Sequence, residues 1–344
     1  MASINKKSLG AVVAVLVMLV LAATFGCSKK KEAAQGFEVA ELKYQGWPGS
    51  VILPELAEDL GYLAPLRLKW VGATNSGPQD IQATASGDVD FGYAFSGSIV
   101  NLVKAQAPIT MVVSAHGISS RIWTGYYVLE ESPIRTARDL IGKKVAMNTL
   151  GAHHEFAVRD YLQREGLTGD EIKKVSLVVV PPMNAEQALR QKQVDMINLS
   201  AILKDKALER GGIRPLFTDY ELFGEHSTHG YVMTNKFIRE NPKATRKFVE
   251  ATARAIEWLR SHPREEVIER FEKIIKARGR NENAEPLKHW KGTAVAGTGG
   301  VIAEQEIRIW IDWLEKMGQL KKGEIKPGDV YTNEFNPYLT KAGK

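Results

Sequence analysis

Glycine stands at four places where the chain is expected to begin a helix, and at two of them serine follows it. These places are Gly49–Ser50, Gly77, Gly97–Ser98 and Gly151–Ala152. The first N–H groups of a helix have no partner inside it and carry a partial positive charge, so they can bind the oxygen atoms of an anion. The same residue types also favour ordinary turns and helix caps, which is the better explanation for any one of these positions taken alone.

Arg121 is a second residue suited to anions. It follows Ser119 and Ser120, and its planar guanidinium could form two parallel hydrogen bonds with a sulfonate or a carboxylate. An exposed loop arginine with no ligand is the commoner situation.

Two groups of histidines could be assembled into a metal site. They are His153–His154–Glu155 and Glu225–His226–Ser227–Thr228–His229. Zinc needs three or four converging ligands, whereas adjacent histidines on a helix point about 100 degrees apart. We therefore expect no metal site and no cofactor, and we keep His153 and His226 as groups that could hydrogen-bond a ligand.

The motifs of several enzyme classes are missing from the sequence. There is no Gly-x-Ser-x-Gly elbow and no His-Glu-x-x-His pair. Gly297–Thr298–Gly299–Gly300 lacks the Lys-Ser/Thr of a phosphate-binding loop. We therefore expect this segment to be a loop ahead of a helix, and we expect the protein not to be an enzyme.

The N-terminus predicts export. Lys6 and Lys7 precede an apolar run of 13 residues, Ala11–Ala23, which is shorter than the roughly 20 residues of a membrane-spanning helix. Cys27, the only cysteine, follows this run and a glycine, and here the chain resembles a bacterial lipoprotein. We expect a signal peptide at 1–26, and a lipidated Cys27 followed by a flexible tether at 27–37, so that no thiol is left for catalysis.

Composition points to a globular protein that binds no nucleic acid. Apolar residues make up 44% and charged residues 25% of the 344 residues, values close to the average. The net charge of +6 falls to +4 once the two lysines of the signal are removed. A basic excess this small is poor evidence for nucleic-acid binding.

Strand and helix patterns alternate along the chain, which predicts an α/β fold with mainly parallel sheets. The expected elements are strands at 39–44, 66–71, 89–95, 109–115, 144–147, 176–180 and 194–199, and helices at 51–60, 78–86, 98–106, 155–165, 185–192 and 244–261. Gln82–Ala83 followed by Val89–Asp90 recurs 105 residues later as Gln187–Ala188 followed by Val194–Asp195. We interpret this echo as two topologically equivalent halves, with chance similarity as the alternative.

An apolar stripe marks a buried helix near the C-terminus. Ile307, Trp310, Ile311, Leu314 and Met317 are spaced by three and four residues. Trp310 is therefore expected to be a core residue and not part of a ligand site.

A series of landmarks now resembles the substrate-binding proteins of sulfonate, taurine and nitrate ABC importers, which are related to the binding proteins for thiamine-pyrimidine precursors. The landmarks are Gly46–Trp47–Pro48–Gly49, Gly77–Pro78–Gln79, Gly87–Asp88–Val89–Asp90–Phe91–Gly92, Ser132–Pro133–Ile134, Asp139–Leu140–Ile141–Gly142–Lys143–Lys144–Val145–Ala146 and Tyr331–Thr332–Asn333–Glu334–Phe335. They run in the family's order from residue 40 to residue 335.

The resemblance implies the two-lobed type II periplasmic-binding-protein (Venus-flytrap) fold, each lobe a mixed, mainly parallel sheet flanked by helices. Lobe one would comprise 38–127 plus 230–344, and lobe two would comprise 128–229. Tyr126–Leu129 and Gly230–Met233 would be the hinges. The ligand would lie between the lobes, at the carboxyl ends of the strands.

The resemblance also implies a set of ligand-binding residues around this cleft. Trp47 and Tyr93 could pack on the apolar part of an organic ligand, whereas Phe95 is expected in the core. The full expected set is Trp47, Pro48, Gly49, Ser50, Gly77, Tyr93, Ser96, Gly97, Ser98, Arg121, Gly151, Ala152, His153, Asn198 and His226.

The implied function is capture of a small polar, anionic organic ligand by closure of the two lobes. The receptor, expected to be a monomer, would be periplasmic or on the cell surface, held to a membrane by its lipid. It would deliver the ligand to an ABC permease whose cytoplasmic ATPase subunits supply the energy. Sulfonate, taurine, nitrate, an aromatic acid or a pyrimidine precursor all remain candidate ligands. The alternatives are a lipoprotein that senses its ligand for a membrane kinase or cyclase, and a precursor synthase of the same fold.

Overall fold

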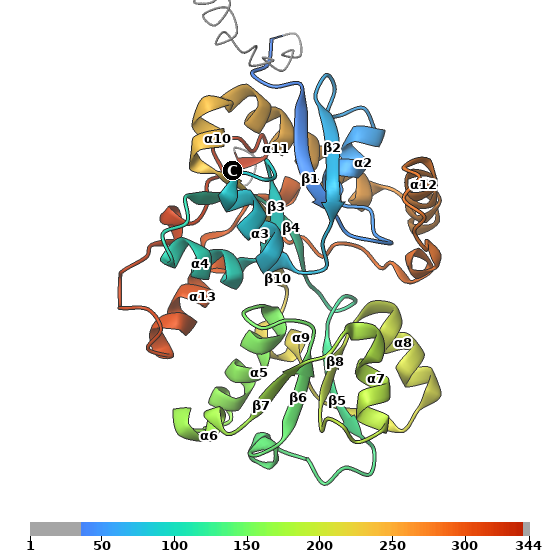
Figure 1. The fold of residues 1–344 in the computed structure, drawn as a ribbon, viewed down its shortest axis with the longest axis vertical. Coiled ribbons are helices and arrows are strands. Elements are labelled where there is room, and N and C mark those ends of the chain that lie inside the picture. Colours follow the sequence, from blue (N-terminus) through green and yellow to red (C-terminus); the bar gives the residue numbers. More distant parts are fainter. Residues whose placement is uncertain (1–35, 340–344) are drawn as a thin grey trace, which may run out of the picture.

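The computed structural model describes residues 36–339, which form two lobes stacked along the long axis of the molecule (Figure 1). The expected signal peptide, Cys27 and most of the expected tether lie outside the described residues. None of the helices between residues 36 and 339 has the length and apolar character needed to span a bilayer.

Lobe one contains both ends of the described chain. Its strands are β1 (Glu41–Gly46), β2 (Arg67–Ala73), β3 (Gly92–Phe95), β4 (Ile109–Ile118) and β10 (His226–Thr234). Its α-helices are α2 (Leu53–Asp59), α3 (Gly77–Ser86), α4 (Ser96–Lys104), α10 (Asn235–Glu240), α11 (Pro242–Ser261), α12 (Arg264–Ala277) and α13 (Glu304–Lys316). Strand β1 pairs in parallel with β2, and β10 lies antiparallel between β3 and β4.

Lobe two is one continuous segment. Its strands are β5 (Gly125–Leu129), β6 (Lys144–Met147), β7 (Ser176–Val179), β8 (Ile197–Leu199) and β9 (Ile213–Thr218). Its α-helices are α5 (His153–Arg164), α6 (Gly169–Lys173), α7 (Pro182–Arg190), α8 (Ala201–Arg210) and α9 (Asp219–Phe223). Strand β6 pairs in parallel with β7, whereas β5 lies antiparallel between β8 and β9.

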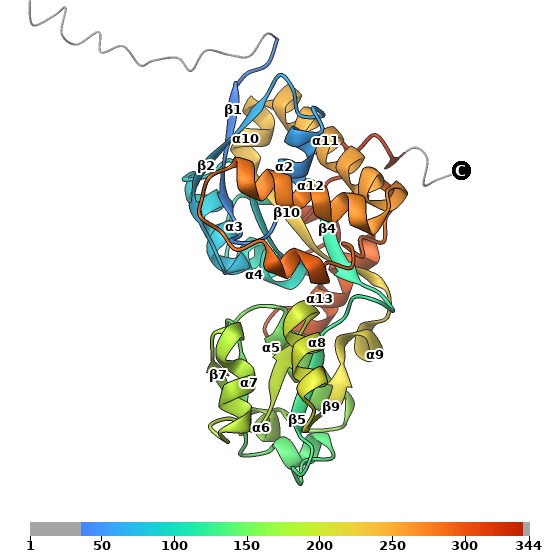
Figure 2. The ribbon, with the colours of Figure 1, turned by 90° about the vertical axis from the view of Figure 1, so that its right-hand side faces the viewer.

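Side-chain alternation along the central strands divides each lobe into two cores. In β10, Tyr231 and Met233 pack into the core beneath α2, α11 and α12, while Val232 packs into the core beneath α3, α4 and α13. In β5, Tyr126 faces α5 and Tyr127 faces α7. The central strands of each lobe therefore have helices on both faces (Figure 2).

The expected secondary structure agrees well with the observed elements. Strand β6 has the expected bounds, and α11 begins two residues earlier than expected, at Pro242. Trp310 is fully buried in the core, as its stripe predicts. The sheets are mixed, as expected, because β5 and β10 run against their neighbours.

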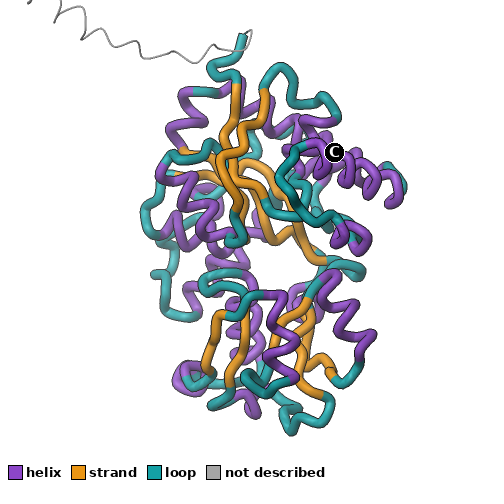
Figure 3. The backbone as a smooth tube through the Cα atoms, turned by 45° about the vertical axis from the view of Figure 1, so that its right-hand side comes forward, coloured by secondary structure: helices purple, strands orange, loops and turns teal. Residues whose placement is uncertain are grey.

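The chain crosses between lobes at 119–124 and at 224–225, earlier at both places than the expected hinges (Figure 3). Tyr126–Leu129 lies within β5, where Tyr126 and Tyr127 pair with both β8 and β9, and the next two residues pair with β9. Gly230–Met233 lies within β10, between two lobe-one strands. Both expected hinges therefore lie inside sheets, and the segments that pass between the lobes are the turns just before β5 and β10.

Candidate functional site

A cavity of about 570 Å³ lies between the lobes, within the usual range of small-molecule sites. Its wall takes residues from lobe one, from lobe two, from both crossings and from the loop at 289–293. This is where the resemblance places the ligand, and the residues in the wall show which chemistry the cavity can perform.

Aromatic rings form the lobe-one wall. Tyr93 stacks on His229 with ring centroids 5.4 Å apart, and Trp47 meets Tyr93 edge-on at 5.9 Å. Phe95 is buried against Trp310, as expected of a core residue, and it also reaches the cavity wall. This surface is suited to a flat or apolar part of a ligand. The buried indole Nε1 of Trp47 has no partner among the described residues.

Three histidines of the wall, His116, His154 and His229, are held neutral. Burial, reinforced by the charge of His153, lowers the pKa of His116 to about 4 and that of His154 to about 3. Burial and the neighbouring histidines also lower the pKa of His229 well below its usual value. A neutral imidazole offers one donor and one acceptor, so these side chains contribute hydrogen bonds and not charge.

His153 is tied to Asp219 across the interior of the cavity. Its Nε2 lies 2.9 Å from Asp219 Oδ2, and the other carboxylate oxygen accepts the backbone N–H of Thr124 at 2.8 Å. Burial raises the pKa of Asp219, but the His153 and Thr124 hydrogen bonds outweigh it and hold this pKa below its usual value. Asp219 is therefore ionised and already satisfied, which leaves the unpartnered Nδ1 of His153 for a ligand.

The cavity also contains two cations without acidic partners. Lys204 from α8 and Arg121 from the first crossing both line the wall, and neither forms an ion pair within the described chain. The helices α3, α5 and α8 begin at the same cavity, with Gly77, Ala152 and Ala201 in its wall. Helix starts and free cations together favour a negatively charged ligand.

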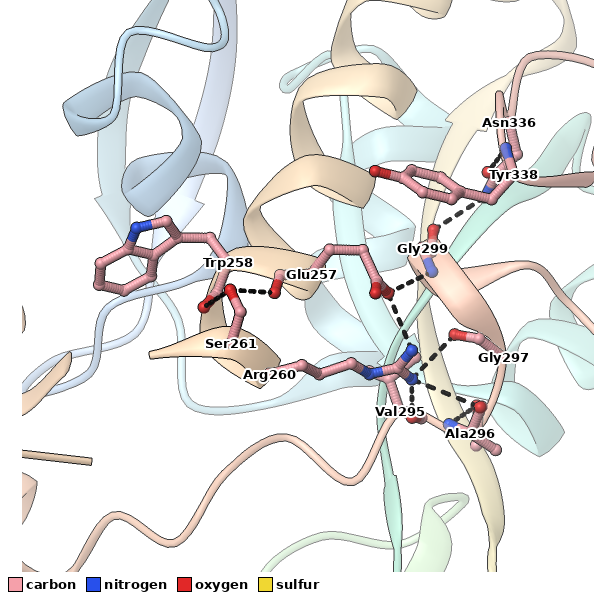
Figure 4. A network of polar contacts seen from close by, with 11 residues as sticks. Glu257, Trp258, Arg260, Ser261, Val295, Ala296, Gly297, Gly299, Asn336 and Tyr338 are labelled. Atoms are coloured by element: carbon pink, nitrogen blue, oxygen red, sulfur yellow. Dashed lines mark hydrogen bonds and ion pairs between the residues drawn. The ribbon is translucent and has the colours of Figure 1, made fainter. Parts of the chain in front are cut away.

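The loop at 289–293 lines the cavity from lobe one, and Arg260 anchors the segment that follows this loop. The guanidinium donates to the carbonyl oxygens of Val295, Ala296 and Gly297 and pairs with Glu257 at 2.8 Å (Figure 4). Glu257 in turn accepts the N–H of Gly299 at 2.6 Å. These bonds tie the backbone just beyond the loop to α11, and the loop itself is held by Arg264 of α12, which donates to the Trp290 carbonyl at 2.8 Å.

The lobes touch on both sides of the cavity. On one side Ser98 Oγ donates to the Gly151 carbonyl at 2.7 Å, and Phe156 of α5 packs on Trp313 of α13 with centroids 4.5 Å apart. On the other side Lys291 pairs with Asp205 of α8 at 2.7 Å. Contacts between the two lobes therefore bridge the cleft at both of its edges.

The structure brings part of the expected ligand-binding set into the cavity wall. Lining it are Trp47, Ser50, Gly77, Tyr93, Arg121, Ala152 and His153. Outside the wall are Pro48, Gly49, Ser96, Gly97, Ser98, Gly151, Asn198 and His226.

The residues outside the wall have local roles. The N–H groups of Gly49 and Gly151 are taken by Glu282 at 2.8 Å and by Glu155 at 2.9 Å, so the expected oxyanion cradles are absent at these two places. Asn198 donates to the Ala146 carbonyl at 3.0 Å and links strands of lobe two.

The remaining residues outside the wall pack against other parts of the chain. Ser96 is fully buried in lobe one, Gly97 lies against Phe95, and the ring of His226 lies beside Phe223. Pro48 is exposed in the turn before α2.

Several residues of the wall are not in the expected ligand-binding set. They are His116, Trp123, Asn148, Thr149, His154, Ser200, Lys204, Asp219, Thr228 and His229. Most of them come from segments that pattern alone assigns to core strands or solvated helix faces. One usable signal exists, because Asn148–Thr149 follows the expected strand at 144–147, at its carboxyl end.

Comparison with known proteins identifies the family. The family model described as NMT1/THI5 like matches residues 56–266, more than half of the chain. The chain belongs to the NMT1/THI5-like family. A Brucella abortus protein that bears the name of a binding protein is 22% identical over 268 residues, covering 76% of this chain and 79% of that protein. A 4-amino-5-hydroxymethyl-2-methylpyrimidine phosphate synthase of Candida albicans is 26% identical over 231 residues, 61% of this chain and 63% of the synthase.

Solved structures establish the fold of this NMT1/THI5-like protein. The periplasmic aliphatic sulphonate binding protein SsuA from Escherichia coli superposes with a TM-score of 0.63 at 20% identity, over 84% of this chain and 91% of its own. The fold is thus the two-lobed periplasmic-binding-protein fold. Among residues 36–339, no group of three or more His, Cys, Asp or Glu side chains is arranged to hold a metal ion.

Proposed function

We propose that this protein is the solute-binding receptor of an ABC importer and captures a small organic anion between its lobes. The observation that carries the proposal is the cavity wall itself, which combines two unpaired cations, Lys204 and Arg121, with stacked rings at Tyr93 and His229. An anionic group would neutralise the cations, and the organic part would cover the rings.

Export and membrane anchoring belong to the same proposal. The signal at 1–26 and a lipid on Cys27 would hold the receptor at a membrane, as a monomer, beside the permease that it supplies. The similar solved structures that are named as periplasmic binding proteins support this location. Ligand would be released to the permease, whose cytoplasmic ATPase subunits drive transport.

A pyrimidine precursor or other flat heterocycle is the second candidate ligand. The neutral imidazoles of His116 and His154 and the unpartnered Oδ1 of Asn148 would accept hydrogen bonds from ring or amino N–H groups. Similarity to the Candida albicans synthase points in the same direction.

A thermal-stability screen of residues 28–344 tests the function. The panel contains alkanesulfonates, taurine, nitrate, aromatic carboxylates and pyrimidines. A ligand at 100 times its dissociation constant stabilises the folded receptor by about 2.7 kcal/mol, which moves the melting temperature by several degrees. We expect a hit among organic anions that weakens in Trp47→Ala. Stabilisation by pyrimidines alone would select the second candidate, and stabilisation by none of these classes would contradict a receptor for either.

A further inference from the structure

We propose that Lys204 and the Ser200–Ala201 turn at the start of α8 form the subsite that binds the anionic group of the ligand, with Trp123 holding the lysine in place. The proposal rests on the proposed function in one respect, that the cavity between the lobes is the ligand site. It adds which residues recognise the charge and therefore which ligands are rejected.

The position of Lys204 is unusual for a lysine. The residue is 5% exposed, and its ammonium lies 3.3 Å from the centroid of the Trp123 ring. The ammonium donates one hydrogen bond, to the Trp123 carbonyl oxygen at 3.1 Å. An ammonium has three donors, so this contact leaves two for a ligand in the cavity that Lys204 lines.

Within residues 36–339, no carboxylate near Lys204 is free to neutralise its positive charge. Asp205, the neighbouring carboxylate on α8, is paired with Lys291 at 2.7 Å, and Asp219 is satisfied by His153 and Thr124. Burial, then the charge of Lys291, lower the pKa of Lys204 to about 8 against the opposing effect of Asp205 and Asp219. A buried cation without a counter-ion is costly, and an anionic ligand relieves that cost.

The turn before Lys204 completes the subsite. Ser200 and Ala201 both line the cavity, and Ala201 has a backbone φ of +45°, a conformation that residues with a side chain rarely adopt. The first N–H groups of α8 have no partner within the helix. These N–H groups lie at the cavity because Ser200, Ala201 and Lys204 all line it. The backbone N–H of Lys204 donates the first helical hydrogen bond of α8 to the Ser200 carbonyl, at 3.2 Å.

Trp123 links this subsite to the movement of the lobes. It lies in the first crossing, at 119–124, while Lys204 belongs to lobe two. The ammonium contacts both the ring and the carbonyl of Trp123, so an anion bound to Lys204 also fixes lobe two against the crossing. Ligand charge would in this way favour the closed arrangement of the lobes.

Calorimetric titration with a matched anion and neutral compound tests the subsite. The probes are benzenesulfonate and benzenesulfonamide, which differ mainly in charge. In Lys204→Met at pH 7 we expect benzenesulfonate affinity to fall at least thirtyfold and benzenesulfonamide affinity to change less than threefold. Lys174→Met, which removes an exposed lysine from lobe two, should leave both unchanged. Lys204→Arg should recover part of the benzenesulfonate affinity.

The pH profile supplies an independent readout. Wild-type benzenesulfonate affinity should be level below about pH 8 and fall at higher pH as Lys204 loses its proton, and the profile of Lys204→Met should be flat. Equal benzenesulfonate affinity in wild type and Lys204→Met would overturn the subsite and leave the receptor function standing. No benzenesulfonate binding by wild type at any pH would overturn the subsite, while the receptor function is decided by the wider ligand screen. Melting curves of each variant verify folding, and Lys204→Met should melt no lower than wild type because it removes a buried charge.

Discussion

Asp90 and Asp195, 105 residues apart in the sequence, make the same pair of hydrogen bonds in the two lobes. Asp90 accepts the N–H of Lys43 in β1 at 2.6 Å and donates its own N–H to the Lys43 carbonyl at 2.9 Å. Asp195 does the same with Lys144 in β6, at 2.8 Å in both directions. Each lobe thus attaches its first parallel strand in the same way, which supports the interpretation of the sequence echo as two equivalent halves.

The helix ends beside these aspartates differ in one respect that can be tested. Gly87 after α3 and Lys192 after α7 occupy equivalent left-handed positions, with φ of +85° and +58°. Glycine adopts this conformation without strain, and lysine does not. We expect Lys192→Gly to increase the free energy of unfolding by about 0.5–1 kcal/mol in urea titrations, whereas Gly87→Lys lowers it by about 1–2 kcal/mol. A destabilised Lys192→Gly would mean that the two positions are not equivalent.

Glu306 in α13 should make stability depend on pH. It is 4% exposed and accepts a hydrogen bond from Ser114 at 2.9 Å, and burial raises its pKa to about 7. Between about pH 4.5 and 7 the folded protein holds a proton that the unfolded chain has lost, so stability falls as pH rises through this window. At pH 8, Glu306→Gln should unfold with a free energy about 1–3 kcal/mol higher than wild type.

The matching control for Glu306→Gln is the same comparison at pH 4.5, where the two proteins should melt at nearly the same temperature. If the melting temperatures of wild type and Glu306→Gln differ by the same amount at every pH from 4.5 to 8, the Glu306 carboxyl group does not make stability depend on pH.

Glu55 holds the turn that contains Trp47. It is buried, pairs with Arg278 at 2.8 Å and Arg280 at 3.1 Å, and Arg278 also donates to the Ser50 carbonyl. Glu55→Gln leaves the buried Arg280 guanidinium without a carboxylate and leaves Arg278 with Glu282 alone, so we expect a loss of about 3 kcal/mol in unfolding free energy.

Asp59→Asn provides the exposed comparison for Glu55→Gln. It breaks the Asp59–Arg270 pair on the surface and should change the unfolding free energy by less than about 1 kcal/mol. Equal effects of the two substitutions would show that burial of the Glu55 network does not matter.

The Asp205–Lys291 pair joins the lobes, so it must break when the cleft opens. We expect Asp205→Asn to raise the ligand dissociation rate about two- to fivefold, in line with a partly exposed ion pair, with little change in the association rate. Stopped-flow tryptophan fluorescence measures both rates. Asp170→Asn, which breaks the exposed Asp170–Lys173 pair within lobe two, should alter neither. A change confined to the association rate would contradict the idea that the Asp205–Lys291 pair holds the closed lobes together.

Much of the fold was predictable from sequence because the strands are short apolar runs and α11 and α13 carry clear stripes. The site was less accessible. Lys204 stands in the polar run Lys204–Asp205–Lys206, which is typical of a solvated helix face, and only the folded chain places Trp123 over it. Gly49 has the residue type of an anion cradle, yet its N–H is already bound by Glu282, a residue far away in sequence.

A crystal structure of residues 28–344 with the best-binding organic anion from the screen tests the central claim most directly. We predict one ligand between the lobes, with its charged group within hydrogen-bonding distance of Lys204 Nζ and its organic part against Tyr93 and His229. A ligand bound outside this cavity, or one whose charged group lies away from both Lys204 and Arg121, would contradict the account.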